Sequence, residues 1–315
     1  MDRGPGAASR SSSGTKMSCP NYKRRRVLEV LANSLRRGQA VFTWVVVVAT
    51  ILLWSCRPQV PLRPVVTGDD PSSKTTAYLI SRGNYLLPGA ALLLDYPRRK
   101  FNLDWARPLV DTVLAKLSDP KEFATVGVFA RMVDPVPARA LKPSITQTIE
   151  SFRPIPTTYA VLQGLYCDWA PPPAEFRTFL LEDKASLKHW RVSSLVALAY
   201  LKANGCLQES DWSGIATELL VRYRVFLDEI VASQAPPGAE FVETVGGIFF
   251  ALGGSYVKDA WAMYLIEHQR PDGTWNEAGA SGSDADDLTA AWGLLAILEY
   301  THPQAGPVPV IPSEA

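Results

Sequence analysis

Four segments of this chain read as helices that are apolar on nearly every side, and they limit its fold more than any other feature. Each opens with a polar residue in its first positions, carries Gly or Ala where backbones could approach, and is separated from the next by a more polar segment. An all-apolar helix lies inside a domain and an amphipathic one outside. The four inner segments are 157–167, 193–206, 242–254 and 286–300.

The rest of the body also has helical spacing, with apolar residues three and four apart between Pro, Gly or Asn residues. These segments are 103–118, 121–133, 174–186, 211–233, 241–252, 256–269 and 286–301. No convincing alternating strand pattern interrupts them, so the predicted fold class is all-α. The inner segments open about 36, 49 and 44 residues apart, which is typical of a helical-hairpin repeat. Such hairpins form either an open solenoid or a closed ring.

One stretch favours the ring. Residues 258–275, KDAWAMYLIEHQRPDGTW, place Gly273 four residues after Gln269 and Trp275 six residues after it. This resembles the QW repeat of the terpenoid cyclase and prenyltransferase α/α-toroid superfamily. The Pro-Asp-Gly sequence supplies a turn, Trp275 is expected across the Gln269 side chain, and the amide would bond exposed backbone at a neighbouring helix end. The resemblance implies a single α/α toroid over 75–302.

An acidic cluster stands before the last inner segment. Asp284-Ala285-Asp286-Asp287 resembles the D-x-D-D sequence with which class II terpene cyclases protonate an alkene or epoxide. The resemblance implies that Asp286 is the general acid, flanked by Asp284 and Asp287, in a dry pocket where aromatic faces stabilise a carbocation. The candidate faces are Trp292, Trp261, Phe249 and Phe250.

The same cluster has a simpler interpretation as the start of a helix. Ser283 and Asp286 have capping-box spacing, and acidic residues in a first helical turn are favoured by the helix dipole. Class II cyclases also enclose their substrate between two helical domains, whereas this chain has room for one. The sequence therefore favours a module that binds a ligand or partner, and a lipid- or isoprenoid-acting enzyme is the alternative.

The N-terminal region differs from the body in charge and hydropathy. Residues 1–40 hold nine Lys or Arg against Asp2 and Glu29, a net charge of +7, which leaves 23 basic and 29 acidic groups in the remainder, a net charge of −6. The uncharged run 40–56 follows directly. Its length is at the short end for a membrane-spanning helix, and the positive-inside rule then keeps residues 1–39 in the cytoplasm.

We therefore predict that 40–56 is a transmembrane signal anchor and that the body is extracytoplasmic. A removed signal peptide is the alternative, although Trp54 occupies a position where cleavage sites need a small residue. A further alternative is that Cys56 is lipidated and becomes the new N-terminus. The Pro-rich stretch 57–74 reads as a linker, and 303–315 reads as a flexible tail.

Other chemistry has little support in the sequence. The only histidines, His189, His268 and His302, lack metal-ligand spacing with a Cys, so we predict no metal and no cofactor. No phosphate-binding loop, serine triad or nucleic-acid surface stands out. Partners are expected to be the membrane, through 40–56, and an apolar lipid, an isoprenoid or a protein.

Two further groups are left open by the sequence. Cys167 and Cys206 lie near the C-terminal ends of successive inner segments, so they are either bridged in an oxidising compartment or simply buried. His189, Trp190, Glu240 and Glu243 could line a cavity, with Glu243 expected to be an ordinary first-turn acid.

Overall fold

A computed structural model describes residues 70–117, 126–182, 184, 186–275 and 284–313. Every regular element in these residues is a helix, so the all-α prediction is confirmed. All of them belong to one compact unit, Leu62–Ala315. The predicted basic region 1–39 and anchor 40–56 lie outside the described residues.

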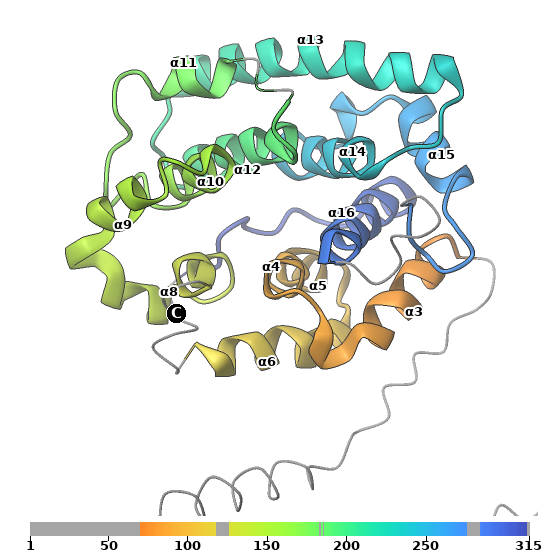
Figure 1. The fold of residues 1–315 in the computed structure, drawn as a ribbon, viewed down its shortest axis with the longest axis horizontal. Coiled ribbons are helices and arrows are strands. Elements are labelled where there is room, and N and C mark those ends of the chain that lie inside the picture. Colours follow the sequence, from red (N-terminus) through yellow and green to blue (C-terminus); the bar gives the residue numbers. More distant parts are fainter. Residues whose placement is uncertain (1–69, 118–125, 183, 185, 276–283, 314–315) are drawn as a thin grey trace, which may run out of the picture. The chain divides into compact units, whose positions relative to one another are not determined.

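The predicted inner segments form four helices whose side chains are mostly buried. They are α10 (Pro156–Leu165), α12 (Trp190–Ala203), α14 (Ala239–Ala251) and α16 (Asp284–Thr301). They pack in chain order, α10 on α12, α12 on α14 and α14 on α16, and Figure 1 shows the first three following one another across the molecule. Their all-apolar sequences reflect this burial on several sides.

Glycines let the inner helices approach closely. A Cβ atom on Gly164 would lie 2.5 Å from the carbonyl oxygen of Ala197, and one on Gly246 would lie 2.7 Å from the carbonyl oxygen of Trp292. These distances are too short for a side chain. The small residues noted in the sequence therefore mark the α10–α12 and α14–α16 crossings.

The segments between the inner helices form outer helices with one buried side. α13 packs against α11, α12 and α15, and its opposite face exposes Val221 and Val225. This explains the more polar composition of these segments. These helices are α11 (Phe176–Leu181), α13 (Glu209–Ser233) and α15 (Asp259–Glu267), and the short η5 (Gly254–Tyr256), which has no buried residue, precedes α15.

The N-terminal part of the unit contributes shorter elements. α16 packs against α3 and α4, α4 packs against η3, and η3 packs against α10. These contacts complete a circuit that runs from α10 through α12, α14 and α16, and then through α4 and η3 back to α10. The elements are α3 (Ser72–Arg82), η1 (Gly83–Tyr85), α4 (Pro88–Leu93), α5 (Asp95–Phe101), η2 (Asp104–Ala106), α6 (Arg107–Lys116), η3 (Gly127–Met132), α8 (Pro135–Ala138), η4 (Arg139–Ser144) and α9 (Ile145–Ser151).

Both ends of the described unit extend into segments that the sequence assigned to linker or tail. α3 begins at Ser72, three residues before the predicted domain start, and Asp70 accepts a hydrogen bond from the Ser72 backbone N–H at 2.9 Å. In the predicted tail 303–315, the carbonyls of Pro309 and Val310 accept hydrogen bonds from Arg99. Val308, Val310 and Ile311 pack against the core.

Cys167 and Cys206 form a disulfide, with Cα atoms 6.2 Å apart. The bridge ties the C-terminal ends of α10 and α12. Asn204 reinforces the same junction by donating to the carbonyls of Gly164 and Leu165, both at 3.0 Å. The choice that the sequence left open between a bridge and two buried thiols is therefore decided for the bridge.

Among the helices of the described residues, none combines the length and the hydropathy that crossing a membrane requires. The segment predicted to span the membrane, 40–56, lies outside these residues.

Candidate functional site

The turn that carries the QW-like sequence joins the last hairpin to α3. Gln269 Nε2 donates to Thr75 Oγ1 at 2.5 Å, and that hydroxyl donates to the carbonyl of Gly273 at 3.0 Å. Gly273 has φ of 87°, and a Cβ atom there would lie 2.3 Å from the carbonyl oxygen of Lys74. Only glycine fits such a position. The amide partner is thus a side-chain hydroxyl of α3, where the sequence predicted backbone.

Trp275 completes this clasp between helices. Its side chain is buried and its Nε1 donates to the Leu265 carbonyl of α15 at 2.7 Å. A Cβ atom on Gly293 of α16 would lie 2.3 Å from the indole ring, so the ring lies flush against α16. Trp275 therefore joins α15 to α16, as expected for a clasp residue.

Asp287, the last residue of the acidic cluster, is fully buried and ion-paired. Its carboxylate accepts from Arg82 Nε at 2.7 Å and Nη2 at 3.2 Å, from Tyr78 Oη at 3.0 Å, and from the Leu87 backbone N–H at 2.9 Å. Such a charge-assisted, forked pair is strong. Asp287 therefore holds α3 and the start of α4 against α16.

Burial and the hydrogen bond to Asp287 raise the pKa of the Tyr78 hydroxyl well above its ordinary value of 10.0. Desolvation opposes the phenolate, and the neighbouring carboxylate opposes a second negative charge. Tyr78 therefore stays a hydrogen-bond donor to Asp287 under ordinary conditions.

Asp286, the residue implied as general acid, is 1% exposed. Asp286 and Asp287 lie in the first turn of α16, and tertiary packing covers both. The side chain of Asp284 and the capping residue Ser283 lie outside the described residues, so the capping box stays a prediction.

The aromatic residues proposed as carbocation faces are core residues. Phe250 meets Trp292 edge-on at 5.7 Å between ring centroids, and it also meets Tyr96 and Tyr200 edge-on. Trp261 is fully buried and donates its Nε1 to Asp228 at 2.8 Å. Phe249 is 4% exposed. Neighbouring side chains thus occupy the faces that a cyclase turns towards its substrate.

A second polar group lies at the N-terminal ends of α12 and α14. Glu243 is 1% exposed, so its description as an ordinary first-turn acid is wrong. Its Oε2 lies 2.5 Å from His189 Nδ1, and its Oε1 accepts from the Thr289 hydroxyl at 2.9 Å. Glu240, one turn earlier, pairs with Arg191. Trp190 is buried and donates to the Glu182 carbonyl.

Sequence reasoning missed Arg82, Tyr78 and Thr289. Tyr78 and Arg82 are four residues apart and so share one face of α3, which was a usable signal for a common partner but not for its identity. For Glu243 the missed signal was a carboxylate within an otherwise apolar inner helix. A buried charge of this kind needs partners.

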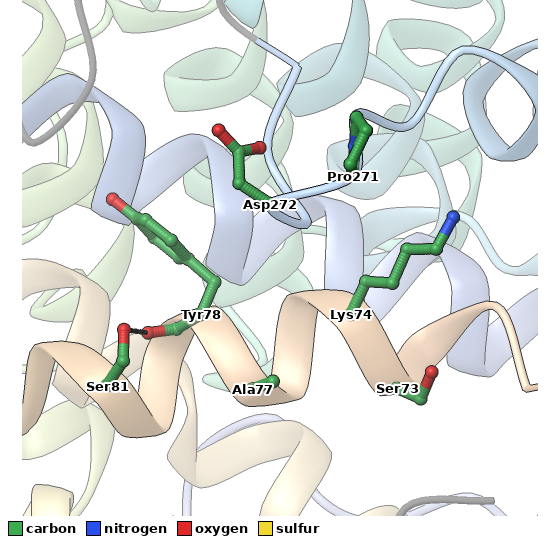
Figure 2. Close-up of a pocket in the computed structure, with 7 residues that line it drawn as sticks. All are labelled: Ser73, Lys74, Ala77, Tyr78, Ser81, Pro271 and Asp272. Atoms are coloured by element: carbon green, nitrogen blue, oxygen red, sulfur yellow. Dashed lines mark hydrogen bonds between the residues drawn. The ribbon is translucent and has the colours of Figure 1, made fainter. Parts of the chain in front are cut away.

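An open groove of about 500 Å³ lies beside the clasp, and Figure 2 shows Tyr78 and Asp272 on its two sides. It is lined by Ser73, Lys74, Ala77, Tyr78 and Ser81 of α3 and by Pro271 and Asp272 of the turn. In the described part of the chain, no three His, Cys, Asp or Glu side chains are placed to hold a metal ion.

Comparison with known proteins gives no match to a family, to a characterised protein or to a solved structure.

Proposed function

We propose that residues 75–302 form a single α/α toroid of the kind found in the terpenoid cyclase and prenyltransferase superfamily. The circuit of contacts from α10 through α16 to α4, η3 and back to α10 supports a ring over an open solenoid. The clasp around Trp275 supports the resemblance, because it joins neighbouring hairpins as the QW-like sequence suggests.

We further propose that this toroid is a ligand- or partner-binding module and not a cyclase. The observation that carries this proposal is the state of Asp287, whose carboxylate is engaged by Arg82, Tyr78 and the Leu87 backbone. A cluster used in this way stabilises the junction of α3 with α16. The packed aromatic rings near α14 and α16 agree with this role.

The proposed location is the extracytoplasmic side of a membrane, with 40–56 as the signal anchor. The Cys167–Cys206 disulfide supports it, since disulfides persist in oxidising compartments. Protease added outside the membrane should cleave the body, and the protein purified from membranes should retain residues near Met1. A mature N-terminus at Cys56 or beyond would contradict the anchor.

An activity assay separates the module from the alternative enzyme with Asp286 as general acid. The full-length chain in detergent would be incubated with a linear isoprenoid alkene and its terminal epoxide, and products would be followed by mass spectrometry. We expect no turnover. Cyclised product that Asp286→Asn abolishes and the exposed control Asp111→Asn retains would establish the enzyme instead.

The binding role is tested by photo-crosslinking in the native membrane. A photoreactive amino acid would replace Val221 on the exposed face of α13 in one variant and Tyr85 beside α3 in another. We expect a discrete adduct at one position, identified by mass spectrometry. If photoreactive variants at all of the exposed positions gave no adduct, the result would contradict a binding module.

A further inference from the structure

We propose that His189 is an acid–base residue, oriented by Glu243, whose Nε2 accepts a proton from a hydroxyl of an uncharged ligand or from water. This goes beyond the binding role, because it adds a proton transfer at the N-terminal ends of α12, α14 and α16. It does not involve the acidic cluster as a proton donor.

The buried carboxylate of Glu243 fixes the protonation pattern of the imidazole. A carboxylate offers only acceptors, so the ring nitrogen that faces it at 2.5 Å, Nδ1 of His189, carries a proton. The Thr289 hydroxyl donates to the other carboxylate oxygen, Oε1, at 2.9 Å and holds the carboxylate in place. This arrangement leaves Nε2 as the basic nitrogen.

The imidazole of His189 is partly accessible. The His189 side chain is 27% exposed, whereas that of Glu243 is 1% exposed. Among the described residues, none forms a hydrogen bond with His189 Nε2. An oriented histidine with one nitrogen bound to a buried carboxylate and the other open is the arrangement used for general-base chemistry.

The backbone of His189 supports a specific role for this position. Its φ is 65°, in the left-handed region, directly before the first turn of α12. A non-glycine residue in this region is strained and persists only when surrounding packing enforces it. The adjacent Trp190 supplies such packing, being buried and bonded to Glu182.

The charges around His189 favour an uncharged ligand. Glu240, Asp286 and Asp287 lie in the first turns of α14 and α16, and Glu243 lies one turn further along α14. The guanidinium groups of Arg191 and Arg82 are bonded to Glu240 and Asp287. An anionic ligand such as a diphosphate would face these carboxylates, whereas an uncharged hydroxyl compound would not.

In the proposed step, the ligand O–H bond breaks and its proton forms a bond with the Nε2 lone pair. The imidazole becomes an imidazolium next to the Glu243 carboxylate, and the electron pair stays on the ligand oxygen, which becomes a nucleophile. Glu243 and Thr289 are positioning residues in this step, and His189 is the residue that meets the ligand.

The first test measures the histidine tautomer by ¹⁵N NMR of the full-length chain in detergent at a pH where the rings are neutral. We expect His189 as the Nδ1–H tautomer, with reversion to the commoner Nε2–H tautomer in Glu243→Gln. His268 is an internal reference, since its Nδ1 lies 2.9 Å from the Tyr264 carbonyl. Glu240→Gln, one turn earlier on α14, is the matched control and should leave His189 unchanged.

The second test measures reactivity at Nε2 with diethyl pyrocarbonate, mapped by peptide mass spectrometry. We expect His189 to be acylated faster in the parent than in Glu243→Gln, with equal rates at the exposed His302. An Nε2–H tautomer in the parent, or a His189 rate insensitive to Glu243, would overturn the proposal. Either result would leave the crosslinking test of the binding module unaffected, and the tautomer of the parent is informative even if a variant fails to fold.

Discussion

Asp287 and Glu243 are both buried carboxylates near the start of an inner helix, yet their surroundings differ. Asp287 is enclosed by Arg82, Tyr78 and the Leu87 backbone N–H, so its bonding capacity is used within the protein. Glu243 is bonded to a partly exposed histidine. The partners are similarly exposed, 21% for Arg82 and 27% for His189. What distinguishes the two pairs is that a guanidinium offers only donors, whereas an imidazole keeps a second ring nitrogen that can accept a proton.

The largest effect is expected at Asp287, whose carboxylate is enclosed by its partners. Asp287→Asn keeps the shape of the side chain but removes the buried negative charge with which Arg82 pairs. Breaking a buried pair in this way costs about 3–5 kcal/mol in unfolding free energy, measured by urea denaturation. Asp111→Asn breaks an exposed pair with Arg107 and should cost less than about 1 kcal/mol. Equal losses would contradict the structural role of Asp287.

A substitution in the clasp tests whether the surroundings of α16 depend on packing as well as on charge. Trp275→Ala removes a buried ring that lies between α15 and α16. A loss of about 3–5 kcal/mol is expected from large-to-small substitution in a core, read as a lower melting temperature. An unchanged melting temperature would show that Trp275 does not clasp the hairpins.

The disulfide lies at the other end of α12 from His189 and so tests whether the two ends are independent. Cys206→Ser opens a link across a sequence separation of 39 residues, and loss of loop constraint predicts roughly 4 kcal/mol. Reductant should destabilise the parent but not the variant. The His189 tautomer should stay the same, and a change in it would show that the two ends are coupled.

Glu243→Gln makes the matching change in the pair of Glu243 with His189, and its expected effect is smaller. The glutamine amide N–H can donate to His189 Nδ1, and the glutamine oxygen can still accept from the Thr289 hydroxyl. The expected loss is about 1 kcal/mol by urea denaturation. A loss as large as that of Asp287→Asn would make Glu243 a structural residue of the same kind.

The smallest effect concerns Tyr78 and its pH dependence. Tyr78→Phe removes one hydrogen bond to Asp287 and should cost about 1 kcal/mol at pH 7. Because the pKa of Tyr78 is raised in the folded state, its contribution is present below about pH 10 and is lost as the pH rises towards the folded pKa. The difference in stability between parent and variant should therefore shrink above pH 10. A constant difference would show that the Tyr78 pKa is not raised.

The sequence by itself determined the helical class and the identity of the inner helices. Apolar residues around the whole circumference of 193–206 and 286–300 require burial on several sides, and the Pro-Asp-Gly sequence before Trp275 requires a turn. These are local properties, because they depend on residues within a few positions of each other. They needed no knowledge of distant contacts.

Only the tertiary structure decided what the carboxylates do. Arg82 and Asp287 are 205 positions apart, and His189 and Glu243 are 54 apart. Local spacing describes Asp286, Asp287 and Glu243 equally well as acids in a first helical turn. Packing of α3 on α16, and of α12 on α14, removes them from water, and a buried carboxylate must find its partners wherever the fold brings them.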